Sequence, residues 1–113
     1  MALKILSKTI LFFVLYTSSF FAASEFVTIQ NFRVWSNTYG SDTIRVDTPG
    51  SALINPHSCT DADSYMVSAE LDDKSKARIY SALLAAVMAK KPITLWVNGC
   101  ERDRPAILNT IIE

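Results

Sequence analysis

The sequence has few of the residues that metal sites use. Its 113 residues include two cysteines, Cys59 and Cys100, and one histidine, His57. A zinc site needs four ligands, or three and a water, and neither cysteine belongs to a paired motif. Asp61 and Asp63 lie close together, but the further oxygen ligands of a calcium loop are missing. We therefore predict no metal and no cofactor.

Catalytic patterns are also lacking. A hydrolase needs a nucleophile beside a base, or two carboxylates at a fixed separation. His57, Ser58 and Asp61 are the only residues that resemble such a set. Neighbouring residues on one loop rarely adopt triad geometry. The sequence therefore favours a protein that is not an enzyme.

Apolar runs long enough to span a membrane are missing as well. The apolar run at residues 10–15 follows Lys4 and Lys8, is interrupted by polar residues 17–19, and is followed by small residues 22–24. A spanning helix needs about 20 apolar residues. The alternative of a membrane anchor is thus disfavoured, and the pattern is typical of a secretory signal peptide.

The predicted signal peptide, residues 1–23, leaves one small domain, residues 24–113. It contains two of the 11 basic residues and none of the 11 acidic ones, so the remainder has a net charge of −2. Phosphate binding requires a basic surface, and nucleic acid is therefore not an expected partner. We predict a secreted or periplasmic protein with no membrane span after cleavage.

Export also changes the interpretation of the cysteines. An oxidising compartment favours pairing of Cys59 with Cys100, the only two thiols. This bond would close a loop of about 40 residues and contribute roughly 4 kcal/mol of stability.

One segment, residues 73–90, has a sustained helical period. Asp72 or Asp73 can cap its first turn, and Pro92 cannot continue it. The predicted apolar face, with Leu84 at its centre, consists of Ile79, Tyr80, Leu83, Leu84, Val87 and Met88.

The other periodic segments favour strands. In the first of these segments the apolar residues switch from odd positions, Val27 and Ile29, to even positions, Phe32 and Val34. This switch predicts a bulge near Gln30 or Asn31. The predicted strands are residues 26–35, 44–46, 64–71, 93–97 and 106–112, with a long loop at 48–63 and a turn at Asn98 and Gly99. The order β-β-β-α-β-β predicts a mainly β protein with one helix, an OB-like five-stranded barrel. The alternative is an open α+β sheet with the helix on one face.

Two segments carry a likeness to a known family. Residues 78–86, RIYSALLAA, lead to residues 95–100, LWVNGC, and Cys59 precedes the predicted third strand. The chain resembles small bacterial secreted proteins related to the subtilase-cytotoxin B subunit. The resemblance implies an OB barrel that assembles into a ring, binds glycans on host surfaces, and has a catalytic toxin subunit as a partner.

Exposed aromatic and polar side chains near the predicted turns are candidate ligand contacts, because OB barrels bind ligands through such loops. The candidates are Trp35, Asn37, Tyr39, Ser41, Arg102 and Asp103. The alternative is that Trp35 and Trp96 are core residues. Two functions remain open: a secreted glycan-binding module, toxin B-subunit-like and homo-oligomeric, or a monomeric periplasmic OB-like structural or stress protein without catalytic activity.

Overall fold

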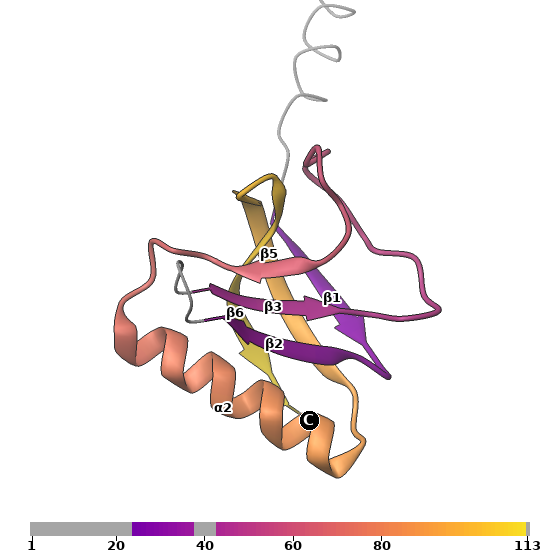
Figure 1. Ribbon diagram of the computed structural model, residues 1–113, viewed down its shortest axis with the longest axis vertical. Helices are drawn as coiled ribbons and strands as arrows, with labels where there is room; N and C mark the ends of the chain where they lie inside the picture. Colours follow the sequence, from indigo (N-terminus) through magenta and orange to yellow (C-terminus); the bar gives the residue numbers. More distant parts are fainter. Residues whose placement is uncertain (1–23, 38–42, 113) are drawn as a thin grey trace, which may run out of the picture.

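The computed structural model describes residues 24–37 and 43–112. As predicted, this part of the chain is mainly β with one helix (Figure 1). Its elements are β1 (Glu25–Ile29), β2 (Arg33–Asn37), β3 (Thr43–Asp47), β4 (Tyr65–Val67), α2 (Asp73–Ala89), β5 (Ile93–Glu101) and β6 (Arg104–Ile111). The predicted signal peptide, residues 1–23, lies outside the described residues.

The six strands form one mixed sheet in the order β1-β5-β6-β4-β3-β2. All neighbouring pairs are antiparallel except β4 and β6, which are parallel. The connection between these parallel strands contains α2 and β5. Parallel strands require such a long crossover, since a tight turn can join only antiparallel neighbours.

The prediction of one long first strand with a bulge was wrong. Residues 26–35 form parts of two strands, because the chain breaks between Ile29 and Arg33, where Asn31 has a left-handed φ of 51°. β1 pairs with β5 and β2 pairs with β3, so these consecutive strands lie at opposite edges of the sheet. The order is therefore β-β-β-β-α-β-β, and the sheet is open, so a closed five-stranded barrel is not confirmed.

The break still accounts for the change of phase in the sequence. One core contains Val27 and Ile29, which precede the break, and Phe32, which follows it. Val34 packs against the same core. Because the two strands follow different directions, each places its own set of alternate residues inside.

The helix begins and ends almost where the sequence predicts. Asp72 is the N-cap, and its carboxylate accepts a hydrogen bond from the Ser75 N–H at 2.7 Å. Lys90, in the left-handed conformation, is the C-cap and donates its N–H to the last turn.

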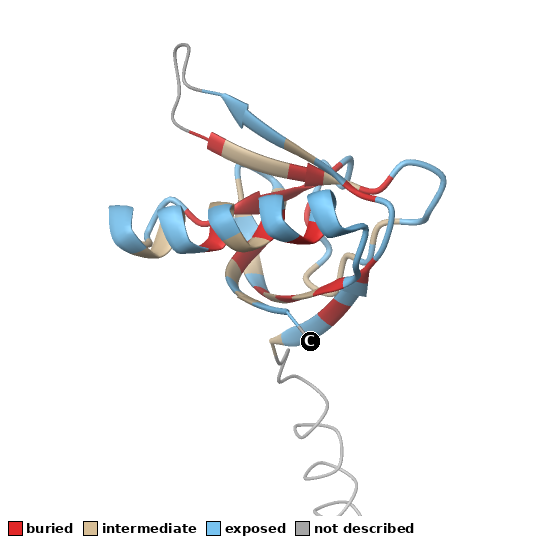
Figure 2. Cartoon of the chain, turned by 90° about the horizontal axis from the view of Figure 1, so that it is seen from below, coloured by how far each residue is buried: buried red, intermediate tan, exposed pale blue. Residues whose placement is uncertain are grey.

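The predicted apolar face of α2 was too wide. Ile79, Leu83 and Ala86 are buried, whereas Leu84 is 37% exposed and Met88 is 84% exposed. The helix contacts β6 and β2 along one narrow stripe, so only residues at the stripe's centre reach the core. The exposed side of the helix is visible in Figure 2.

The strands after the long loop differ from prediction at their ends. β4 covers Tyr65–Val67 rather than residues 64–71, and all three of its residues are buried. β5 continues to Glu101 through Asn98 and Gly99, where its register with β6 shifts, so the predicted turn is an irregular strand. A register shift accommodates the left-handed φ of 72° at Gly99 without ending the strand.

The last strand begins two residues earlier than predicted. β6 covers Arg104–Ile111, and its residues 105–107 are buried while Ile111 and Ile112 are exposed. Both faces of β6 are therefore buried only along the first half of the strand.

The predicted disulfide is confirmed. Cys59 and Cys100 are bonded, and their Cα atoms are 5.8 Å apart. The bond ties the long loop between β3 and β4 to the end of β5. The Asn55 side chain holds the same loop, because it accepts a hydrogen bond from the Cys59 N–H and donates one to the Cys59 carbonyl, both at 2.9 Å.

Candidate functional site

The first hairpin, β2 and β3, carries a group of polar side chains that contact one another across the two strands. Val34 packs against the core and Val46 is buried in it. Since side chains alternate along a strand, Arg33, Trp35 and Asp47 lie on the opposite side. Arg33 is paired across the strands with Asp47. We call the surface formed by Arg33, Trp35, Arg45 and Asp47 the Trp35 face.

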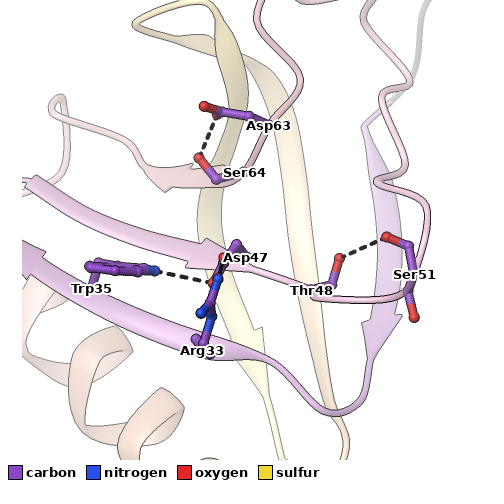
Figure 3. A network of polar contacts seen from close by, with 7 residues as sticks. All are labelled: Arg33, Trp35, Asp47, Thr48, Ser51, Asp63 and Ser64. Carbon is purple, nitrogen blue, oxygen red and sulfur yellow. Dashed lines mark hydrogen bonds and ion pairs between the residues drawn. The ribbon is translucent and has the colours of Figure 1, made fainter.

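Asp47 is the centre of this face (Figure 3). Its carboxylate accepts hydrogen bonds from Arg33 Nε at 3.2 Å and Nη2 at 2.5 Å, and from Trp35 Nε1 at 3.1 Å. The Arg33 guanidinium also lies 5.5 Å from the centre of the Trp35 ring. These contacts fix the orientation of an indole that is 50% exposed.

The ion pair changes the acidity of both partners. The hydrogen bond from Arg33 holds the pKa of Asp47 below its ordinary value, against the opposing effect of partial burial. The same bond raises the pKa of Arg33. Both groups are therefore charged across the neutral range, and the contact that orients Trp35 persists there.

Arg45 lies beside this group, because it is the cross-strand partner of Trp35. Its Nε atom is buried and has no hydrogen-bond partner among the described residues. Its charge contributes to the lowered pKa of Asp63, after the larger effects of Arg104 and Ser64. The Trp35 face therefore contains two charges that are paired with each other, Arg33 and Asp47. It also contains a further cation, Arg45, whose Nε makes no hydrogen bond with the described residues.

The second predicted contact region is the turn between β5 and β6. Arg102 and Asp103 occupy its two central positions, with φ values of 49° and 67°. This is the geometry of a tight hairpin turn that usually contains glycine. The turn is supported because the Asp61 N–H donates to the Asp103 carbonyl at 2.8 Å and Arg104 Nη1 donates to the Arg102 carbonyl at 3.0 Å.

Arg104, which the sequence did not single out as a site residue, organises this turn. It forms ion pairs with Asp61 at 3.0 Å and Asp63 at 2.7 Å. The hydrogen bond from Arg104 lowers the pKa of Asp63, and the same bond raises the pKa of Arg104. Arg102 and Asp103 are exposed at the tip of the turn.

The two regions are not one contact set. The sheet order places β3 and β4 between β2 and β6, which amounts to three strand spacings or about 14 Å. Trp35 and Arg102 are therefore too far apart to hold the same small group. Asn37 ends β2 opposite Thr43, while Tyr39 and Ser41 lie outside the described residues.

Sequence reasoning found Trp35 but missed Arg33, Arg45 and Asp47. A signal for them does exist: Arg33 and Trp35 are two residues apart, and Arg45 and Asp47 have the same spacing in the next strand. In a hairpin these four side chains share one side of the sheet.

The described residues contain no group of three His, Cys, Asp or Glu side chains that could hold a metal ion. Both ring nitrogens of His57 are buried and have no hydrogen-bond partner among the residues that the structure describes. His57 is thus not joined to Ser58 or Asp61 by a hydrogen bond. Across residues 24–37 and 43–112, no helix is sufficiently long and apolar to cross a membrane.

Comparison with known proteins adds no relative to this description. The chain matches no protein family, no curated protein and no solved structure at a significant level.

Proposed function

We propose that this chain is a secreted glycan-binding module that functions as a homo-oligomer, as toxin B subunits do. The Trp35 face is the sugar-binding surface in this proposal. The observation that carries it is the half-exposed Trp35 indole, held in place by a hydrogen bond to Asp47.

An exposed aromatic ring in a fixed orientation suits carbohydrate. The apolar C–H face of a sugar ring stacks on an aromatic ring, and nearby polar groups then select its hydroxyl pattern. Asp47 and Arg33 supply an acceptor and donors beside the indole. Because they already hold each other, ordering the site on binding costs little conformational entropy.

The topology supports an OB-like architecture. β1 and β2 lie at opposite sheet edges, yet only three residues join them. Such a connection spans about 14 Å at most, so the two edges approach each other at this corner. If β1 and β2 are the two halves of one bent strand, the order becomes three strands, a helix and two strands, which is that of a partly open OB barrel.

Exposed apolar side chains support assembly. Phe26 on β1 is 67% exposed, Met88 on α2 is 84% exposed, and Ile111 and Ile112 at the end of the chain are also exposed. The free edges of β1 and β2 add unpaired backbone groups. A ring would cover part of this surface and repeat a weak site several times, which raises the strength of attachment to a cell surface. A separate catalytic toxin subunit is the partner that such a ring would carry.

The test is a glycan array probed with the oligomer and with three variants. Trp35→Ala should weaken binding to any positive glycan by at least about tenfold, the loss expected for a central tryptophan. Ile54→Ala is the control, since it removes another exposed apolar side chain, 47% accessible, that lies outside both the Trp35 face and the apolar surface assigned to assembly. Arg102→Ala should have a smaller effect because Arg102 lies outside the Trp35 face.

Light scattering should give a mass several times that of one chain at micromolar concentration. A monomer with a blank array would refute the proposal and favour a monomeric structural or stress protein. Equal binding by Trp35→Ala and the unmodified protein would place the glycan site elsewhere.

A further inference from the structure

A cavity lies on the other side of the first hairpin, between β2, β3, β4 and the first half of α2. Its volume is about 230 Å³. Ser36 faces into it, one residue along the strand from Trp35, so the two side chains point to opposite sides of the hairpin. Figure 2 shows the hairpin and α2 separating toward the N-terminal end of the helix. The lining residues are Ser36, Ile44, Val67, Asp73, Lys76, Ala77 and Tyr80.

The cavity has an apolar floor and a polar rim. Ile44, Val67 and Ala77 supply the apolar part. The polar part comes mainly from the helix, where Asp73, Lys76 and Tyr80 follow one another at three- and four-residue steps and share one side. Ser36 adds a hydroxyl from the facing strand.

Within the described residues, the side chains of Ser36, Asp73, Lys76 and Tyr80 form no hydrogen bond or ion pair with one another or with other side chains. They line a common hollow and are available to a ligand. Their combined charge is zero, since the Asp73 carboxylate balances the Lys76 ammonium. The rim thus offers acceptors and donors without favouring an anion or a cation.

We propose that this cavity binds one neutral monosaccharide ring. A sugar hydroxyl both donates and accepts, so it can donate to Asp73 and accept from Lys76, with Ser36 and Tyr80 serving either role. The C–H face of the ring would lie on the apolar floor. The volume is below the roughly 300–1,000 Å³ of clefts that enclose drug-sized molecules, which fits a single ring.

This site is separate from the Trp35 face and does not depend on it. The Trp35 face has an extra cation, Arg45, whereas the cavity rim is neutral. The two surfaces are therefore expected to differ in ligand, and a variant of one should leave the other intact.

The experiment is a titration followed by backbone amide NMR, with protein expressed from the full sequence. The probes are glucose, galactose, mannose and N-acetylglucosamine, with glucuronate and leucine as an acidic sugar and a zwitterion. At least one neutral sugar should shift the amide signals of Ser36, Ile44, Ala77 and Tyr80. Glucuronate and leucine should bind at least tenfold more weakly than that sugar.

Three variants sharpen the test. Lys76→Ala and Asp73→Asn should each weaken binding by at least about tenfold, because each removes a hydrogen bond to a charged group. Ala77→Leu should block it by filling an exposed position on the floor. Lys74→Ala is the matched control, since Lys74 is on the same helix but does not line the cavity. Trp35→Ala should leave the titration unchanged, which separates this site from the glycan surface proposed above.

The proposal is overturned if no neutral sugar shifts these signals, if leucine or glucuronate binds as well as the sugars, or if Lys76→Ala and Asp73→Asn bind as tightly as the unmodified protein.

Discussion

Leu83 and Leu84 are adjacent on α2 but have different roles, and replacing each with alanine tests the docking of the helix. Leu83 is fully buried in the core, whereas Leu84 is 37% exposed. Truncating a buried leucine costs about 2–5 kcal/mol, because apolar contacts are lost and a cavity remains. For a partly exposed leucine both terms are smaller. The helix propensity change is the same in both variants, so it cancels in the comparison.

The expected difference is large for a protein of this size. A small domain has a total stability of about 5–15 kcal/mol. One kcal/mol moves the unfolding midpoint by roughly 4–8 °C in a domain of 60–100 residues. Leu83→Ala should therefore lower the midpoint by about 10 °C or more, and Leu84→Ala by clearly less.

Thermal unfolding followed by circular dichroism measures this difference, and urea unfolding at 25 °C gives the free energies. Both variants must first show the helical and strand signals of the unmodified protein at low temperature. Equal midpoints for the two variants, or a larger loss for Leu84→Ala, would mean that a different stripe of α2 faces the sheet. The second result would restore the apolar face predicted from the sequence.

Two further predictions concern stability. Cys100→Ser opens a 41-residue loop between Cys59 and Cys100; it should lower the unfolding free energy by roughly 4 kcal/mol, and a variant as stable as the parent in urea would contradict this. The pKa of Asp47 is lowered by its bond from Arg33, so the folded state binds this proton less readily than the unfolded chain. The resulting stability is complete above the ordinary aspartate pKa of about 4 and is lost as the pH falls through the lower folded value. Asp47→Asn should flatten, without abolishing, the fall in unfolding free energy between pH 5 and 2, since Asp63 titrates in the same sense; an unchanged slope would refute this role for the ion pair.

Several features were readable from the sequence because short-range chemistry sets them. The helix limits follow from the Asp72 cap and from Pro92, each of which acts within one turn. The disulfide follows from two thiols and a predicted export signal. The short strand around Ile44 and Val46 follows from alternation alone. Trp35, one of the candidate contacts named from the sequence, is half-exposed and not part of the core, which the sequence had left open.

Other features depend on partners that are distant in the sequence. The change of phase near Asn31 is a local signal, but only pairing with β5 on one side and β3 on the other turns it into two edge strands. Asn98 and Gly99 favour a turn by local chemistry, yet β5 continues through them because β6 pairs beyond the register shift. The turn moves to Arg102 and Asp103, where Asp61 and Arg104 stabilise it.

The same division holds for the candidate sites. Composition and periodicity place Trp35 beside a turn and give α2 an apolar side, since both follow from residues that are neighbours in the chain. Strand register decided that Arg33 and Asp47 hold the Trp35 indole, and helix docking decided that Leu83 rather than Leu84 enters the core. Tertiary structure decides such matters because a helical period defines a stripe without saying which part of it meets the sheet. Alternation likewise defines two sides of a strand without naming the neighbour across from it.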